Sequence, residues 1–228
     1  PGNNKGVPFA TDYLIGVLLP TENFDLFSQI SEVIPLAIDE INSSNMTFGR
    51  KLNVIFGEDP KCSGNAAVQA FSTLVQSSEP NVVIGPACSA GCELTGIFSA
   101  GFKLFQISYA CHSPILSNKE TYPTFARTVT SFQSTAFVFL SFFQKYAWTR
   151  GAIVHDTNIE LWLQAGEATK KAFASAKDIF MDTFPVDNDI PLVVGRVLAQ
   201  RHKKLILFLD EQSVRSLMLE AYKSRNII

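Results

Sequence analysis

Long apolar runs are absent from this chain of 228 residues. A helix that spans a membrane needs roughly 18 or more consecutive apolar residues, and the most apolar stretch, from Ala136 to Phe143, is far shorter. We therefore expect that stretch to form a buried helix, and any membrane anchor to lie outside the chain. The sequence begins at Pro1, without a Met or a secretory signal, which indicates a processed or excised piece.

An excess of charge of either sign is also missing. The formal net charge is -2, and charged residues make up 18% of the chain against 46% for hydrophobic residues. A protein that binds nucleic acid mainly through phosphates needs a strongly basic face, so the charge argues against this class of partner. The apolar content is sufficient for buried cores, in one large domain or two small ones.

Signatures of catalysis are missing too. The sequence contains no P-loop, no glycine-rich dinucleotide turn, no G-x-S-x-G turn and no H-E-x-x-H motif. His155 and Asp156 follow a predicted strand, where α/β proteins place functional groups, but no nucleophile accompanies them in a recognisable pattern. We interpret them as an ordinary pair at a strand end. The cations from Arg201 to Lys204 fall at a predicted helix end, where they complement the helix dipole, and are interpreted as a solvated cap.

Four cysteines leave two interpretations open. Cys88, Cys92, Cys111 and the adjacent His112 could supply three sulfurs and one nitrogen to a zinc ion, but structural zinc sites favour tighter pairs. Disulfides in an oxidising compartment are the favoured alternative, so no metal site is expected. Pairing Cys62 with Cys88, and Cys92 with Cys111, would join the ends of neighbouring strands, although the sequence by itself does not fix the pairing.

Two N-glycosylation sequons support an oxidising compartment. Asn42 and Asn45 each begin an N-x-S/T triplet in a polar, turn-like stretch, where an acceptor asparagine would be exposed. Each triplet alone is weak evidence, because such triplets often arise by chance. Together with the even number of cysteines they favour a secreted context.

Short apolar runs alternate with helical patterns along the whole chain. The run from Tyr13 to Leu19 has almost no polar residue, as is typical of a strand buried on both faces of a parallel sheet. The other predicted strands are 52–56, 81–84, 104–109, 151–155, 179–184 and 205–209. The predicted helices lie within 27–41, 68–75, 93–101, 132–146, 161–174, 191–200 and 214–221. This alternation indicates a doubly wound α/β architecture.

The predicted elements divide into two series near residues 127–133. We expect a first lobe of residues 1–128 and a second lobe of residues 129–228, joined by a short hinge because no Pro- or Gly-rich linker separates them. The second series ends at a helix after three strands. The second lobe is therefore expected to be truncated.

Two polar loops follow neighbouring strands of the first lobe. Residues 85–92 (Gly-Pro-Ala-Cys-Ser-Ala-Gly-Cys) open a helix, and residues 107–114 (Ile-Ser-Tyr-Ala-Cys-His-Ser-Pro) follow the next strand. Ligands of open α/β sheets bind just past the carboxyl ends of strands, and a helix N-terminus attracts anionic groups. The same residues could instead be plain turn chemistry with Ser89 as a helix cap, and the pattern alone favours neither interpretation.

At these two loops the chain resembles a known family. The residues that carry the resemblance are Gly85-Pro86-Ala87-Cys88, Ile107-Ser108-Tyr109-Ala110, Ser113-Pro114-Ile115-Leu116-Ser117 and the run from Tyr122 to Thr128, with further matches at 38–42 and 147–150. They resemble the type I periplasmic-binding-protein-like ligand-binding region shared by natriuretic-peptide-type and metabotropic glutamate receptors. Within that family, Cys62, the Gly-Pro-x-Cys turn and Tyr109-Ala110-Cys111 are most similar to invertebrate receptor-type guanylate cyclases.

This resemblance implies a two-lobed α/β fold in which each lobe is a doubly wound, mostly parallel sheet. It also implies a disulfide between Cys62 and Cys88, and a homodimer formed through the first lobe. The parent protein would carry a membrane helix, a kinase-like region and a cytoplasmic cyclase that converts GTP to cyclic GMP, none of which is in this sequence. The chain itself would be a binding module without a cofactor. It would lie on the extracellular face of the plasma membrane, or be secreted if it ends here.

A ligand cleft is expected between the lobes. The residues expected to line it are Ser89, Ala90, Ser108, Tyr109, Ala110 and His112, with His155 and Asp156 opposite. Cys111 and His112 stand where amino-acid-binding relatives have hydroxyl residues, which argues against an amino-acid ligand. The natriuretic relatives hold a chloride near the Gly-Pro-x-Cys turn, and the corresponding candidates here are Ser63, Gly85 and Cys88.

Three functions follow, in order of preference. The first is the extracellular ligand-binding fragment of a single-pass receptor guanylate cyclase, in which a peptide or small molecule shifts the populations of open and closed forms. The second is a class C G-protein-coupled receptor ectodomain, or a secreted binding or decoy protein of the same fold. The third is an enzyme that uses His155 and Asp156, which no motif supports.

Overall fold

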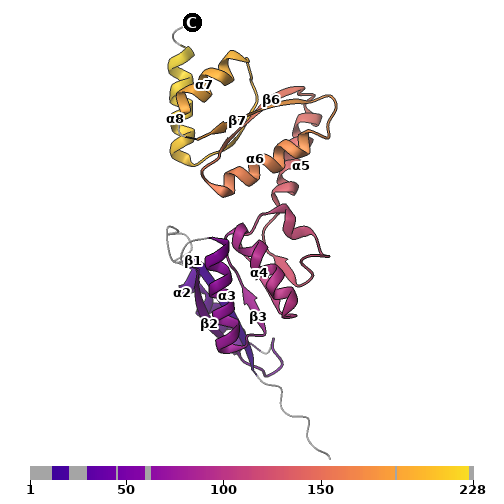
Figure 1. The fold of residues 1–228 in the computed structure, drawn as a ribbon, viewed down its shortest axis with the longest axis vertical. Helices are drawn as coiled ribbons and strands as arrows, with labels where there is room; N and C mark the ends of the chain where they lie inside the picture. Colours follow the sequence, from indigo (N-terminus) through magenta and orange to yellow (C-terminus); the bar gives the residue numbers. More distant parts are fainter. Residues whose placement is uncertain (1–11, 21–29, 45, 60–62, 188, 226–228) are drawn as a thin grey trace, which may run out of the picture. The chain divides into compact units, whose positions relative to one another are not determined.

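The computed structural model describes residues 12–20, 30–44, 46–59, 63–187 and 189–225. The chain forms two compact units, Pro1–Val129 and Thr130–Ile228. Their boundary lies one residue from the boundary expected from the sequence. Figure 1 shows the elements of both units, and each unit has its own hydrophobic core.

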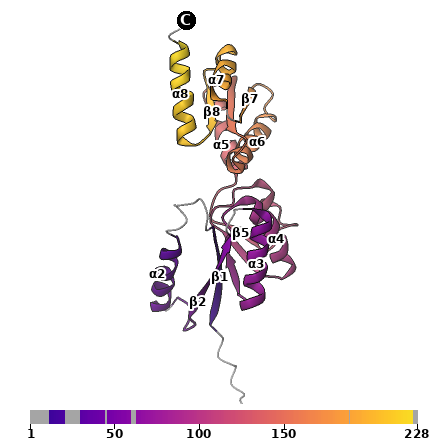
Figure 2. The ribbon, with the colours of Figure 1, turned by 60° about the vertical axis from the view of Figure 1, so that its left-hand side comes forward.

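Unit 1 is built on a parallel sheet of five strands in the order β2-β1-β3-β4-β5. Its strands are β1 (Tyr13–Pro20), β2 (Leu52–Asp59), β3 (Val82–Ile84), β4 (Phe105–Ser108) and β5 (Phe125–Arg127). Its helices are α2 (Ile30–Ser43), α3 (Gly64–Ser78), α4 (Ser89–Gly101) and the 3-10 helix η1 (Pro114–Ser117). Helix α2 lies on one face of this sheet, and α3 and α4 lie on the other (Figure 2).

Strand β1 is buried as its unbroken apolar sequence predicts. Val17 and Leu18 have no exposed surface. Leu18 packs in one core cluster with Phe71 and Leu74 of α3 and with Val83 of β3. Residues 16–20 of β1 are all buried, whereas Tyr13 is 37% exposed, so the apolar run is buried on both faces only beyond Ile15.

Unit 2 contains a parallel sheet of three strands in the order β7-β6-β8. The strands are β6 (Arg150–Asp156), β7 (Phe180–Val186) and β8 (Leu205–Phe208). The helices are α5 (Phe132–Lys145), α6 (Glu160–Phe173), α7 (Ile190–Ala199) and α8 (Glu211–Arg225). Figure 1 shows α5 and α6 together on one side of this sheet, and α7 and α8 on the other.

Alternate side chains of β6 pack against opposite helical layers. Ala152 and Val154 belong to a core cluster with Val193 of α7, whereas Ile153 belongs to a cluster with Phe143 of α5 and Phe173 of α6. Side chains of a strand alternate between faces with a period of two. His155 is therefore expected on the same side as Ile153, toward α5 and α6.

The fold class predicted from the sequence is confirmed, since every pair of neighbouring strands in the described residues is parallel and helices alternate with strands. Two short elements, η1 and β5, were not predicted. Each has only three or four residues, too few for a periodic pattern to be recognised. Helix α4 begins at Ser89 with Cys88 at its N-cap position, earlier than the predicted start near Glu93.

The prediction of a fully buried helix at 136–143 is wrong for one face of α5. Ala136, Leu140 and Phe143 are buried, but Phe137 and Phe142 are each 48% exposed. The apolar run is continuous, whereas the sheet covers only one stripe of a helix. No helix in the described part of the chain is both long and apolar enough to cross a membrane.

Candidate functional site

The two polar loops of unit 1 meet at one edge of its sheet. Strands β3 and β4 are parallel neighbours, with Ile84 in register with Ile107, so the segments that follow them leave the sheet side by side. The backbone N–H of Gly85 donates a hydrogen bond to the carbonyl oxygen of Ile107, at 2.8 Å. Both loops therefore lie at the carboxyl edge, where open α/β sheets bind ligands.

The turn after β3 requires glycine at position 85. Gly85 has φ +99°, and a Cβ atom built on it would lie 2.4 Å from the carbonyl oxygen of Leu18 in β1. Gln106, whose side chain is fully buried, donates from Nε2 to the Gly85 carbonyl at 3.0 Å and to Oγ1 of Thr95 at 2.8 Å. Helix α4, strand β4 and the turn are thus joined by one buried amide.

Ser108 and Ser89 bind other parts of the protein rather than a cleft, contrary to expectation. Ser108 is fully buried, and its hydroxyl donates to the Pro86 carbonyl at 2.9 Å and accepts from the N–H of Cys111 at 3.1 Å. The Ser89 hydroxyl, also buried, accepts from the N–H of Ser113 at 3.2 Å. These hydroxyls satisfy loop backbone groups that would otherwise be buried without partners.

A disulfide joins the two loops. Cys92 in the first turn of α4 is bonded to Cys111 in the loop after β4, and both are fully buried. This confirms the disulfide interpretation over zinc for that pair, and the described residues contain no cluster of metal-ligating side chains. Cys88 is also disulfide-bonded. Its expected partner Cys62 lies outside the described residues, so the Cys62–Cys88 pairing stays a prediction.

The guanidinium group of Arg127, at the end of β5, hydrogen-bonds to the loop after β4. Its Nη1 donates to the carbonyl oxygens of Cys111 and Ser113, at 3.2 and 2.8 Å, and its Nη2 donates to the hydroxyl of Ser117. Burial lowers the pKa of Arg127 from its ordinary value, because the guanidinium loses hydration. The residue lies in the Tyr-Pro-Thr-Phe-Ala-Arg-Thr run that carries the family resemblance, yet its role was not predicted.

Four of the expected cleft residues remain partly open to solvent in unit 1. Tyr109, Ala110 and His112 are half-buried, and the Tyr109 hydroxyl donates to the Leu18 carbonyl at 3.2 Å. Ala90 is likewise half-buried, in the first turn of α4. The loops therefore present Tyr109, Ala110 and His112 on a backbone that buried groups hold in place.

Of the three residues proposed to hold a chloride ion, Gly85 can no longer offer its backbone N–H. The Gly85 N–H already donates to Ile107 and is not available to an ion. Ser63 and Cys88 are the N-cap residues of α3 and α4. The two helix starts are close, since a Cβ built on Gly64 would lie 3.3 Å from the carbonyl oxygen of Ala90. Chloride binding stays a prediction, now resting on Ser63 and Cys88.

His155 does not line a surface of unit 2, contrary to expectation. It is 2% exposed, its Nδ1 has no hydrogen-bond partner among the described residues, and its ring lies against Gly166 of α6. Burial lowers the pKa of His155, because the imidazolium ion would lose its hydration there. Asp156, the next residue, is half-buried, and its carboxylate accepts from the N–H of Asn158 at 2.6 Å.

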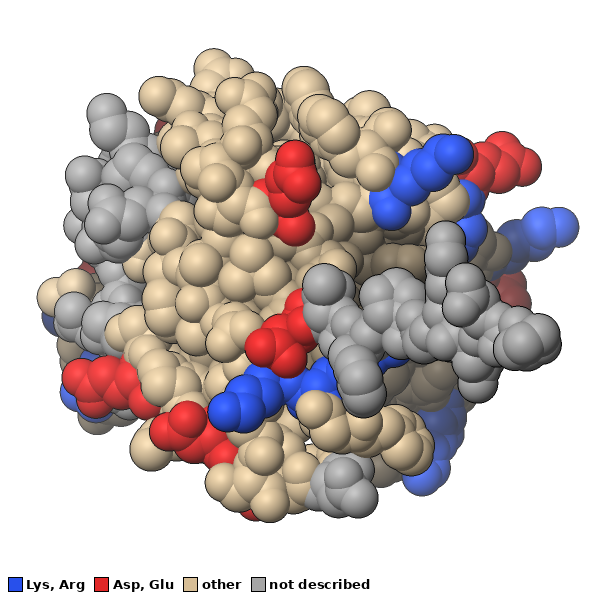
Figure 3. All heavy atoms as spheres, turned by 90° about the horizontal axis from the view of Figure 1, so that it is seen from below, with Lys and Arg blue, Asp and Glu red and all other residues tan. Residues whose placement is uncertain are grey.

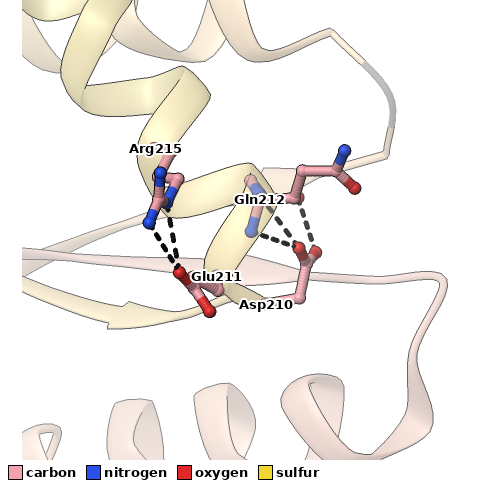
Figure 4. Close-up of polar contacts among 5 residues, drawn as sticks. Asp210, Glu211, Gln212 and Arg215 are labelled. Carbon is pink, nitrogen blue, oxygen red and sulfur yellow. Dashed lines mark hydrogen bonds and ion pairs between the residues drawn. The ribbon is translucent and has the colours of Figure 1, made fainter.

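Other acids at the carboxyl edge of the unit 2 sheet also cap backbone. Asp210 follows β8 and accepts from the N–H of Gln212 at 2.8 Å and from the hydroxyl of Ser213 at 2.6 Å, while Glu211 pairs with Arg215 (Figure 4). The Ser213 hydroxyl lowers the pKa of the Asp210 carboxyl. Asp189 caps α7 through the N–H of Leu192. These carboxylates fix where the helices begin.

Asn42 does not lie in a turn, contrary to expectation. It belongs to α2, and its side-chain amide exchanges two hydrogen bonds with the backbone of Leu52, at 2.8 and 2.9 Å. A glycan on Nδ2 would displace the bond to the Leu52 carbonyl. Asn45 lies outside the described residues, so glycosylation stays a prediction that now favours Asn45.

Comparison with known proteins identifies the family. Residues 29–225 match the receptor family ligand binding region. Gamma-aminobutyric acid type B receptor subunit 1 of Mus musculus is 23% identical over 193 residues, which are 84% of this chain and 20% of that protein. Retinal guanylyl cyclase 2 of Rattus norvegicus is 29% identical over 171 residues (73% and 15%). Guanylate cyclase 32E of Drosophila melanogaster is 26% identical over 181 residues (75% and 15%).

The chain spans about a fifth or less of the length of these relatives. The matched family is a ligand-binding region and not a catalytic cyclase domain, in agreement with the absence of catalytic motifs. The matched residues form two α/β units, each with a parallel sheet. The chain belongs to the family of receptor ligand-binding regions.

Proposed function

We propose that the chain is an extracellular ligand-binding segment of a single-pass receptor guanylate cyclase, which passes a ligand or sensory signal to cytoplasmic cyclic GMP synthesis. The observation that carries the proposal is the pair of loops after β3 and β4, joined by the Cys92–Cys111 disulfide. A buried disulfide fits an oxidising compartment such as the cell exterior. The similarity to two guanylate cyclases supports the proposal that the parent receptor signals through cyclic GMP.

Tyr109, Ala110 and His112 are the contact residues that we propose for unit 1, and Asp156 for unit 2. A ligand that binds one arrangement of the parent receptor better than another shifts the populations by its difference in affinity. The loop backbone is already ordered by Ser108, Gln106 and Arg127. Binding therefore costs little ordering of the loops, and a peptide or small molecule of modest size can act there.

A class C G-protein-coupled receptor is the second candidate. Gamma-aminobutyric acid type B receptor subunit 1 matches over the larger share of the chain, 84% against 73% for retinal guanylyl cyclase 2, although at lower identity. The loop after β4 favours a receptor guanylate cyclase over a class C receptor. Cys111 forms a disulfide there, at the position where amino-acid-binding relatives have hydroxyl residues.

The first experiment is to sequence the parent transcript beyond the codon for Ile228. A membrane helix followed by kinase-like and cyclase regions is the expected result, and the whole protein should then produce cyclic GMP in transfected cells. Seven membrane spans would move the protein to the class C receptors. A stop codon shortly after Ile228 would leave a secreted binding or decoy protein and overturn the signalling proposal.

Contact residues are tested in the same cells. Replacing Tyr109 with Ala, or His112 with Ala, is expected to change the cyclic GMP response to an extracellular stimulus about tenfold, the loss of one or two good contacts. Gln69→Ala, at an exposed position of α3, is the control and should not change the response. An unchanged response in both loop variants would contradict the assignment of this site.

A homodimer through unit 1 is part of the proposal. Helix α4 carries an apolar stripe on its solvent side, with Leu94, Ile97 and Phe98 between 39% and 50% exposed and Phe102 next to them at 58%. Their spacing of three and four residues places them on one face of the helix. An exposed apolar stripe of this kind is typical of a protein interface.

Ile97→Arg is expected to convert the dimer to a monomer, because a charge at the centre of the stripe would be buried without a partner. Sedimentation velocity over a range of concentrations measures the change. Leu36→Arg is the matched control, since Leu36 is 67% exposed on α2, on the opposite face of the sheet. A monomeric wild type, or a dimer that only Leu36→Arg disrupts, would be inconsistent with this interface.

Nucleic acid is not among the proposed partners. On the face shown in Figure 3, basic and acidic side chains lie side by side around a broad uncharged area. With a formal net charge of -2, the chain lacks the charge excess that phosphate-dominated binding requires. The proposed partners are one extracellular ligand and a second copy of the chain.

A further inference from the structure

A hollow in unit 2 is lined by an unusual concentration of cations. It has a volume of about 440 Å³, and the residues used in the argument are Trp148, Arg150, Arg201, His202, Lys203 and Lys204, called here the basic hollow. Arg150 begins β6, and Lys204 immediately precedes β8. The basic hollow therefore lies at the amino edge of this sheet, opposite the edge that carries Asp156 and Asp210.

Most of these cations have no acidic partner in the described part of the chain. The only ion pair recorded there for the hollow joins His202 Nε2 to Asp182 Oδ2, at 2.9 Å. The prediction of a solvated cap is wrong for His202, because its side chain is 1% exposed and also contacts Gln200 Oε1 at 3.0 Å. Arg150, Arg201 and Lys203 are exposed, and the surface ion pairs of this unit lie elsewhere.

The negative ends of nearby helix dipoles are too weak to balance the positive charge of the basic hollow. Helices α5 and α7 both end beside the hollow, since Ala147 and Arg201 follow them and line it. Each helix end contributes about half a negative charge, and Asp182 contributes one more. The four Lys and Arg side chains exceed that total, so the hollow keeps a positive potential that attracts anions.

Flat aromatic faces lie next to these cations. The rings of Phe142 and Tyr146 are stacked with centroids 6.3 Å apart, and those of Tyr146 and Trp148 with centroids 5.2 Å apart. Lys204 Nζ lies 4.7 Å from the centre of the Trp148 ring. Phe142 and Tyr146 are 48% and 52% exposed. An open aromatic row beside unpaired cations provides apolar faces for a ring and donors for its anionic substituents.

We propose that the basic hollow and its aromatic row bind a sulfated polysaccharide, with sugar rings on the aromatic faces and sulfate groups on Arg150, Arg201, Lys203 and Lys204. The volume falls in the range of small-ligand sites and accommodates a short stretch of such a chain. Clusters of Lys and Arg are a known feature of heparin-binding surfaces. Single-stranded nucleic acid shares the charge and the stacking but needs a longer basic groove, which a chain of net charge -2 does not offer.

The test uses the full chain and immobilised heparin in surface plasmon resonance at 0.15 M NaCl. Heparin should bind with an affinity that falls as salt rises, and fully desulfated heparin should not bind. The double variant Arg201→Gln with Lys203→Gln is expected to weaken binding about tenfold, since two charge-assisted contacts are lost. Tyr146→Leu, which keeps apolar volume but removes a flat ring, should weaken it by a smaller factor of about three.

The matched control removes two cations from other positions of unit 2. Lys170→Gln with Arg215→Gln makes the same change in net charge, but Lys170 and Arg215 are paired with Glu167 and Glu211. This control should bind heparin within about twofold of the wild type. No binding of heparin, an equal loss in the control, or tighter binding to an oligonucleotide of matched charge would overturn the proposal. The result is independent of the proposed receptor function, because no ligand response is measured.

Discussion

Replacing Gly85 with alanine is expected to destabilise unit 1 by about 3 kcal/mol, through strain and a backbone clash. At φ +99° an L-residue is strained whatever the space around it. The added Cβ would also lie 2.4 Å from the Leu18 carbonyl oxygen. Leu18 lies in β1, an interior strand between β2 and β3, so its carbonyl cannot move without disturbing the hydrogen bonds of the sheet. The clash would also displace the Tyr109 hydroxyl, which donates to the same oxygen.

Gly195→Ala is the control for this variant. Gly195 lies inside α7, and a Cβ built there meets no atom within 4 Å, so alanine should stabilise unit 2 by up to about 1 kcal/mol. Hydrogen exchange of peptides from β1, β3 and β4 measures the stability of unit 1. Tryptophan fluorescence follows unit 2, because Trp148 and Trp162, the two tryptophans of the chain, pack against its core. A Gly85→Ala protein within 1 kcal/mol of the wild type would contradict the predicted strain.

Gly166→Ala is expected to destabilise unit 2 by about 2–3 kcal/mol, the upper range for overpacking a core. A Cβ built on Gly166 would lie 2.5 Å from Cγ of His155 and 2.8 Å from its Cβ. These atoms are close to the β6 backbone, so rotation of the imidazole cannot clear the clash. Urea denaturation followed by tryptophan fluorescence measures the loss.

A double-mutant cycle identifies the contact responsible. His155→Ala removes the ring, so adding Gly166→Ala to it should cost less than Gly166→Ala costs alone. The expected coupling is at least 1 kcal/mol. Additive effects of the two substitutions would show that His155 does not occupy the space above Gly166.

His155 should also make unit 2 sensitive to acid. Its pKa in the folded protein lies below the ordinary value of about 6.5, so the unfolded chain binds the proton more readily. Stability should therefore fall as the pH drops below about 6.5 and stop falling at the folded pKa, with a slope of at most about 1.4 kcal/mol per pH unit. Glu167 and Asp156 oppose this shift, and Lys170 adds to it. In His155→Ala this part of the pH dependence should disappear.

The order of strands and helices could be predicted from the sequence because most elements carry a clear period or an unbroken apolar run. β1 and α3 are examples, since burial on both faces and burial on one stripe leave different patterns. β5 could not be found, because the three residues Phe125–Arg127 have no period of their own. The exposed face of α5 was missed because Phe137 and Phe142 are apolar although each is 48% exposed in the described structure.

The position of the candidate site could be predicted from the sequence, but not the roles of its residues. Gly85, Cys92 and Cys111 mark the two loops in the sequence, and the structure brings them together at one sheet edge. A sequence does not reveal which polar group is already bonded inside the protein. Ser108 and His155 were therefore placed in a cleft, whereas both are buried. His155 could have been recognised as buried, since β6 was predicted to lie in a parallel sheet covered by helices on both faces.

The support of the loop after β4 has a consequence for how binding preference changes in evolution. Ser108, Arg127 and the Cys92–Cys111 disulfide keep the loop in shape through main-chain oxygens and nitrogens and a covalent bond, none of which depends on the side chain of Ala110. Position 110 can then mutate widely while unit 1 still folds. New ligand preferences can arise there by single substitutions, so a library randomised at Ala110 should yield mostly folded proteins with diverse selectivity.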